Sequence, residues 1–94
     1  MAELCNIRCN NVNDLNTLHR QAPEGVSSYS IVSATLNSPF NIGGVLLNVS
    51  RYSPKNTYSV IFQLVIPIDK SESIVYRNIY IENGNESVED WVKL

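Results

Sequence analysis

Alternating apolar and polar residues predict four β-strands over the last two thirds of the chain. The clearest pattern runs over 57–66, where an apolar side chain recurs at every second position. The ranges 27–36, 45–52 and 74–82 are also rich in β-branched and aromatic residues, and turn-forming stretches separate them. Because such connections join neighbouring strands in opposite directions, the sequence predicts a four-stranded antiparallel meander.

A short helix is expected before this meander, over 13–22. Asn13 has a side chain that caps helix N-termini, and Leu15, Leu18 and Ala22 recur at helical spacing. The helix would have barely three turns, so it would need the sheet to pack against.

A second short helix is expected at the C-terminal end, over 87–94. Ser87 begins a sequence that resembles a capping box, and Val88, Trp91 and Val92 would share one face of the helix. The fold class predicted from these elements is α+β, with one helix before the meander and one after it.

The two cysteines, Cys5 and Cys9, lie in an alternating stretch that makes a fifth strand over 3–9 an alternative. On such a strand the two side chains would lie about 13 Å apart, which is too far for a disulfide bond. The chain has no second cysteine pair, and His19 is its only histidine. We therefore expect buried thiols, no metal site and no cofactor.

Composition indicates one globular domain that spans 1–94. The chain has a mass of 10.5 kDa, and 44% of its residues are apolar whereas only 17% are charged. Twelve Asn and eleven Ser supply much of the remaining polarity, and the net charge is −2. The sequence does not begin with a signal-peptide pattern and has no apolar run long enough to span a bilayer. We therefore expect a cytoplasmic protein without a membrane partner.

The last predicted strand, 74–82, indicates where a binding surface would lie. Its aliphatic residues point to one side and Tyr76 and Tyr80 to the other, so burial of the aliphatics would expose the tyrosines. We take the apolar row of 57–66 as the core side of that strand, which places Gln63 on the same exposed face as the tyrosines. The expected partner-binding residues on or beside this face are Tyr52, Tyr76, Tyr80, Asn48, Asn78, Gln63, Arg51 and Arg77.

Two interpretations of this tyrosine-bearing face stay open. Tyrosine combined with Asn and Ser is typical of protein-recognition surfaces, because the rings are large and rigid and the small polar groups adapt their hydrogen bonds. Depletion of charge is typical of interface cores. The face could otherwise be covered by a terminal helix or by a second copy in a homodimer, which would use the same residues.

Groups for catalysis are sparse in this sequence. A single histidine limits acid–base pairs, no oxyanion-type glycine turn accompanies either cysteine, and Gly43-Gly44 lacks the Lys-Ser/Thr of a phosphate loop. We expect no enzymatic activity.

Binding of single-stranded nucleic acid is the alternative function, because exposed tyrosines stack on unpaired bases. However, seven basic residues in an acidic chain give weak attraction to phosphates.

These features predict a small non-enzymatic protein-binding module that acts as a steric inhibitor or adaptor on a larger protein. In size and composition the chain is similar to small phage-encoded inhibitors of host defence, anti-CRISPR proteins among them, and to bacterial immunity proteins. A phage-encoded protein of this kind would act in the host cytoplasm. The similarity is one of general character and assigns no residue a role.

Overall fold

The computed structural model describes most of the chain, namely residues 14–22, 24–52, 55 and 57–94. The strand expected over 3–9, together with Cys5 and Cys9, lies outside these residues.

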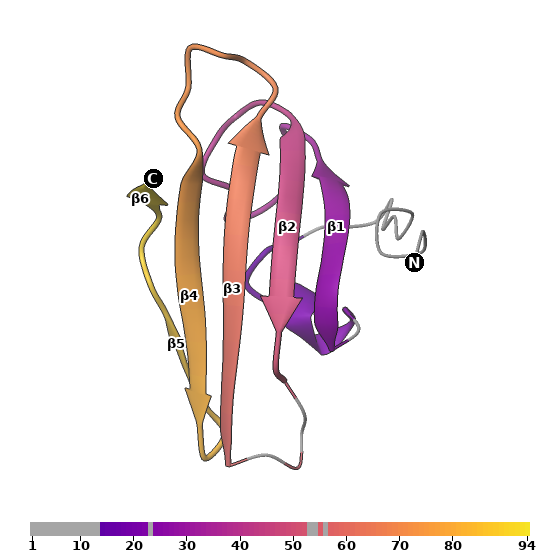
Figure 1. Ribbon diagram of the computed structural model, residues 1–94, viewed down its shortest axis with the longest axis vertical. Coiled ribbons are helices and arrows are strands. Elements are labelled where there is room, and N and C mark those ends of the chain that lie inside the picture. The colour runs from indigo at the N-terminus through magenta and orange to yellow at the C-terminus, as the bar shows by residue number, and fades with distance from the viewer. Residues whose placement is uncertain (1–13, 23, 53–54, 56) are drawn as a thin grey trace.

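The described residues form a single antiparallel sheet of six strands (Figure 1). Strands that follow one another in the chain are neighbours in the order β1-β2-β3-β4-β5, and β6 pairs with β4 beyond the end of β5. The predicted four-stranded meander is therefore confirmed, and the C-terminal segment extends it. The strands are β1 (Gly25–Ile31), β2 (Gly44–Ser50), β3 (Tyr58–Pro67), β4 (Val75–Glu82), β5 (Asn85–Val88) and β6 (Val92–Lys93).

The helix expected over 13–22 is wrong, because the described part of this segment forms only a single 3₁₀ turn, η1 (Leu18–Arg20). The backbone of Leu15 explains the difference, since it binds groups outside the segment. Its N–H donates to Leu36 O at 3.1 Å, and its carbonyl accepts a hydrogen bond from Gln63 Nε2 at 2.9 Å. An α-helix would use that carbonyl in its own ladder. Within the described residues, no helix is long and apolar enough to cross a membrane.

The helix expected over 87–94 is also wrong, because the C-terminal segment forms two short strands along β4. Asn83 and Gly84 have φ angles of 53° and 83°, the left-handed pair that a type I′ hairpin turn requires. This turn reverses the chain, so that Glu86 lies opposite Ile81 in the ladder. The turn residues therefore direct the chain back along β4, and residues 87–94 pair with β4 instead of forming the helix that their spacing predicted.

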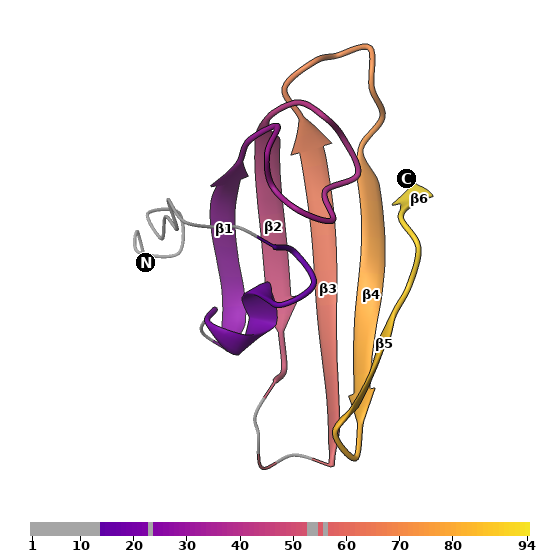
Figure 2. The same cartoon turned by 180° about the vertical axis from the view of Figure 1, so that it is seen from behind.

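The sheet has one covered side and one uncovered side. Residues 14–22 and 32–43 form a covering layer that crosses one side of the sheet over β1, β2 and β3 (Figure 2). Seen from the other side, in Figure 1, the strands have no described segment in front of them.

The core lies on the covered side, in two clusters of buried side chains. Trp91 and Phe40 pack at the edge of the larger cluster, and Tyr52 packs against the smaller one. The larger cluster consists of Leu15, Leu18, Tyr29, Ile31, Leu46, Val65 and Val75, and the smaller one of Ile61, Ile79 and Ile81.

The structure reverses the side on which β2 and β3 were expected to bury their apolar rows. In β3, Ile61 and Val65 are fully buried, whereas Val60 and Ile66 are 39% and 44% exposed. The expectation is confirmed in β4, where the aliphatic residues are buried and Tyr80 is exposed. Both rows of β3 are apolar enough to be buried, so periodicity alone does not choose between them.

Replacing Gly84 by valine tests the hairpin turn. A Cβ at this position would meet nothing within 4 Å, so the cost at a φ of 83° is conformational rather than steric. We expect the free energy of unfolding to fall by roughly 1–3 kcal/mol, measured by urea unfolding with Trp91 fluorescence. Asn85→Val, at a neighbouring position without a positive φ, is the control and should change stability by less than about 0.5 kcal/mol. Equal stabilities of the two variants would contradict the type I′ turn.

Candidate functional site

The uncovered side of β1 to β4, which we call the open face, is the candidate binding surface. One row of alternate residues from each strand shares this side. Glu82 is its one Asp, Glu, Lys or Arg residue. The open face consists of Val26, Ser28, Ser30, Val45, Leu47, Val49, Tyr58, Val60, Phe62, Leu64, Ile66, Tyr76, Asn78, Tyr80 and Glu82.

Large apolar side chains of the open face are accessible to solvent. Tyr58 is 67% exposed, Val45 48% and Tyr80 46%. Single exposed aliphatic residues are ordinary on a protein surface, but a contiguous apolar patch of this kind marks an interaction site. A solvated side of an antiparallel sheet usually carries polar side chains at these positions.

Aromatic rings gather on the β3–β4 half of the open face. Phe62 and Tyr76 stack with their ring centroids 5.9 Å apart and an interplanar angle of 29°. Stacked rings are already fixed in orientation, so they lose little conformational freedom when a partner binds. The centre of the open face is therefore a rigid apolar surface.

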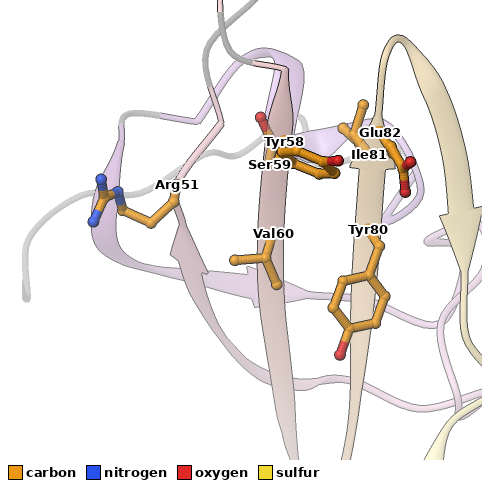
Figure 3. A pocket seen from close by; sticks show the side chains of 7 residues that line it. All are labelled: Arg51, Tyr58, Ser59, Val60, Tyr80, Ile81 and Glu82. Carbon is orange, nitrogen blue, oxygen red and sulfur yellow. The ribbon is translucent and has the colours of Figure 1, made fainter.

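One end of the open face is hollowed, over the ends of β3 and β4 (Figure 3). The hollow has a volume of about 330 Å³. The Tyr58 ring extends toward β4, where Glu82 lies, and Tyr80 points along the sheet away from them (Figure 3). Val60 lines the middle, and Arg51 lies on the far side (Figure 3). A basic and an acidic group thus flank an apolar hollow, which suits an apolar side chain with a polar end.

Three polar residues that were expected on the binding surface are buried beneath the covering layer instead. Asn48, Gln63 and Arg77 lie opposite one another on β2, β3 and β4, with exposed fractions of 0%, 0% and 4%. Gln63 joins the other two, since its Nε2 lies 3.4 Å from Asn48 Oδ1 and its Oε1 accepts a hydrogen bond from Arg77 Nε at 2.9 Å. Gln63 Nε2 also donates to Leu15 O at 2.9 Å. This buried polar ladder ties the sheet to the covering layer.

The polar ladder explains which side of the sheet is covered. On the observed side, the Leu15 carbonyl receives a donor from Gln63. On the open face the central side chains of β3, Phe62 and Leu64, would offer it no donor, and a buried carbonyl without a partner costs about 1–3 kcal/mol. Hydrogen bonding therefore selects the covered side and leaves the more apolar row of β3 on the open face.

Arg77 places a buried charge at the end of the ladder. Its guanidinium carbon lies 4.3 Å from the centre of the Trp91 ring, which is a cation–π contact. Burial lowers the pKa of Arg77 to about 10, and the negative charge of Asp14 opposes this change. Its Nη2 has no hydrogen-bond partner among the described residues. Arg77 is therefore a structural cation beneath the sheet and cannot be the rim contact that the sequence suggested.

His19 is another buried ionisable group on the covered side, with an exposed fraction of 1%. Its ring meets Tyr52 edge to face at 5.1 Å, and its Nε2 lies 3.3 Å from Glu86 Oε2. The same carboxylate oxygen accepts a hydrogen bond from Arg20 at 2.8 Å. Burial lowers the pKa of His19, and Glu86 opposes the change. Burial alone would raise the pKa of Glu86, but hydrogen bonds from Arg20 and His19 lower it. These contacts join η1 to β5.

The expected partner-binding residues therefore fall into three groups. Tyr76, Asn78 and Tyr80 lie on the open face, as expected. Arg51 is exposed at the hollow. Tyr52 packs on the covered side, and the three ladder residues are buried there, so none of these four lies on the open face. For Asn48, Gln63 and Tyr52 the cause is the choice of the wrong row in β2 and β3. Arg77 lies in the β4 row that was expected to be buried, and burial keeps it from the rim contact that was expected of it.

Sequence reasoning missed the centre of the open face, because Val60, Phe62 and Leu64 were assigned to the core. The useful signal was the composition of the opposite row. That row carries Asn48 and Gln63 but no Lys or Glu, whereas a row facing water is usually rich in charge. Amides and serines in a row without charged residues are typical of partnered interior groups.

No group of three or more His, Cys, Asp and Glu side chains among the described residues could hold a metal ion. In comparisons with known proteins, no protein-family model matches the chain, and no curated protein or solved structure shows significant similarity.

Gln63→Leu tests the polar ladder. The substitution introduces an apolar side chain of similar size and leaves Leu15 O and Arg77 Nε without their partner. We expect the free energy of unfolding to fall by about 2–4 kcal/mol, measured by urea unfolding. Asn78→Leu makes a comparable amide-to-leucine change on the open face, and it should alter stability by at most about 0.5 kcal/mol. A smaller effect at position 63 than at 78 would rule out a stabilising ladder.

Acidification tests the burial of His19. Because its pKa in the folded protein lies below the ordinary 6.5, the unfolded chain takes up this proton first. The stability that is present above pH 6.5 is therefore lost as the pH falls through the lowered pKa. The lowered pKa of Glu86 adds a loss only below its ordinary 4.5. Since His19 is the only histidine, the melting temperature between about pH 7.5 and pH 5.5 isolates it.

His19→Gln is the matched variant for this titration. Glutamine retains an N–H for Glu86 but does not titrate, so the melting temperature of the variant should stay level over the same pH range. If wild type and variant lose the same number of degrees, His19 is not buried in its neutral form.

Proposed function

We propose that this chain is a small non-enzymatic protein-binding module, and that its open face covers a surface of a larger protein as a steric inhibitor or an adaptor. One observation carries the proposal. The open face combines exposed aliphatic residues and tyrosines with a single charged residue, Glu82, at its end. Depletion of charge with enrichment of aromatic residues is typical of interface cores. The proposed partner therefore presents an apolar surface.

Tyr58 and Tyr80 are the proposed anchors of this contact. Both are exposed and both border the hollow shown in Figure 3. Tyrosine is enriched among residues that dominate binding energies, because it buries a large area and loses little rotamer freedom. An apolar side chain of the partner would fill the hollow, and Arg51 and Glu82 would bind polar groups at its two sides.

A steric mode of action suits the open face better than a chemical one. Its acidic and basic residues amount to one glutamate, so the face offers area for contact rather than a paired acid and base. Steric inhibition requires only that the open face bind the partner where the partner binds its own substrate or ligand.

Single-stranded nucleic acid is a less well supported ligand class. Tyrosines on a sheet stack on unpaired bases, but the open face contains no Lys or Arg, and Arg51 lies only at its end. Attraction of a phosphate backbone depends on several such cations. Protein is therefore the proposed partner class.

Position-specific photo-cross-linking tests this proposal in the cells that naturally contain the protein. A benzophenone side chain at position 80 should become attached to a larger protein. The same group at Leu36, which is 60% exposed in the covering layer, should not. With that partner purified, Tyr58→Ala and Tyr80→Ala should each weaken its binding roughly 30-fold, as hot-spot residues do. Calorimetric titration measures this loss.

The controls for this test use the same surface. Both tyrosines are exposed, so their variants should keep the melting temperature of the wild type. Ser30→Ala removes a small group from the open face and should weaken binding less than about threefold. Equal cross-linking from positions 36 and 80, or unchanged affinity of both tyrosine variants, would exclude the open face as the recognition surface.

A further inference from the structure

We infer that a second copy of this chain occupies the open face when no larger partner is bound, so that two sheets pack face to face about a two-fold axis. The inference rests on the proposed use of the open face as a docking surface. A second copy bound there would compete with the larger partner for the same residues. A two-fold dimer uses the same patch on both copies, as this arrangement does.

The apolar row of β3 is only partly buried within one chain. The molecule measures 22 Å along its shortest axis. Because stacked layers lie roughly 10 Å apart, this thickness corresponds to the sheet and one further layer. The covering layer lies on the side that carries the polar ladder, so Val60, Phe62 and Leu64 face outward. Small domains have limited cores and often gain stability by association.

The size of the open face is close to what a stable dimer needs. Its four strands contain seven to ten residues each. With strands about 4.8 Å apart and a rise of about 3.3 Å per residue, the face projects an area on the order of 500 Å². Side chains that stand on this plane add accessible surface to the projection. The face thereby approaches the roughly 800 Å² per partner that a standard interface buries.

Its charge allows the open face to pair with itself. The whole chain has a net charge of −2, but the face carries only Glu82, which lies opposite Tyr58 at one end. When the two-fold axis runs across the strands, the two Glu82 carboxylates lie at opposite ends of the sandwich and do not repel each other. A strongly acidic or basic partner would find no complementary charge on this face, whereas a copy needs none.

The twist of the sheet also favours a copy. Two copies of one sheet have the same twist, and sheets of equal twist pack aligned at about −30° with interdigitated side chains. The stacked rings of Phe62 and Tyr76 would then lie near the middle of the sandwich, where they exclude water.

A dimer of this kind would mask the proposed recognition surface. Tyr58, Tyr80 and the hollow between them would be buried, so a larger partner could bind only the monomer. Its apparent affinity would therefore fall as dimer accumulates. Self-association would also keep an apolar sheet side out of water until the partner is met.

Light scattering after size-exclusion chromatography of the full chain tests the inference, over about 1 μM to about 200 μM. We expect a mass of twice 10.5 kDa at the upper concentrations. Val60→Lys and Ile66→Lys alter exposed positions of the open face. Each should raise the dissociation constant of the dimer roughly 100-fold or more, because every dimer would bury two unpaired ammonium groups. The melting temperature of each variant checks that it is folded.

Leu36→Lys is the matched control, since Leu36 is apolar and exposed in the covering layer. This substitution should leave the dissociation constant unchanged. A benzophenone side chain at position 80 of the purified, otherwise wild-type chain should give a covalent dimer, and the same group at position 36 should give none. This measurement identifies the contact surface without any change of charge.

A single species of 10.5 kDa at every concentration would overturn the dimer. The cellular cross-link from position 80 would still test separately whether the open face binds a larger protein. A dimer that survives both lysine substitutions, or that cross-links from position 36 instead of 80, would overturn it by placing the contact elsewhere. If the dimer cross-links from position 80 but no larger protein is captured there in cells, the result would support the dimer and contradict the proposal that the open face binds a larger protein.

Discussion

The hydrogen bonds of the Gln63 side chain are the constraint on which the rest of the structure depends. Gln63 receives a hydrogen bond from Arg77 and donates to the Leu15 carbonyl, in the middle of the covered side of the sheet. A buried amide costs least when its donor and its acceptor atoms both have partners. The covering layer supplies the missing acceptor, so the layer is held on this side of the sheet and on no other.

The open face is the consequence of that choice. Because the covering layer follows the polar groups, the more continuous apolar row of β3 is left outside, with Val60 and Ile66 in contact with water. In most small domains, hydrophobic burial decides the side on which a sheet is covered. Here the polar ladder decides it. Burial of that outer row is therefore left to association, which connects the energetics of the fold to the proposed binding function and to the inferred dimer.

The two ends of the chain show how local signals compete. Helical spacing over 13–22 and 87–94 is genuine, but each segment lies beside a stronger constraint. Near the first, the Leu15 backbone is held by Leu36 and Gln63. Before the second, Asn83 and Gly84 form a tight turn that sends the chain back along β4. A helix shorter than about 12 residues is marginal without tertiary support, so such constraints prevail.

By itself, the sequence determined that the strands β1 to β4 form, their order and the side to which β4 turns its tyrosines. It did not determine where β1 ends, because the predicted range 27–36 continues past Ile31 into the covering layer. The alternation of apolar and polar residues and the short connections between strands are local features, so they can be recognised in the sequence without the tertiary structure. Only the tertiary structure decided which rows of β2 and β3 are covered, and hence that Asn48, Gln63 and Arg77 are interior while the apolar row of β3 forms the binding surface. Either row of β3 satisfies the alternating pattern. The choice depends on a carbonyl 48 positions away from Gln63, and that contact exists only when the chain is folded.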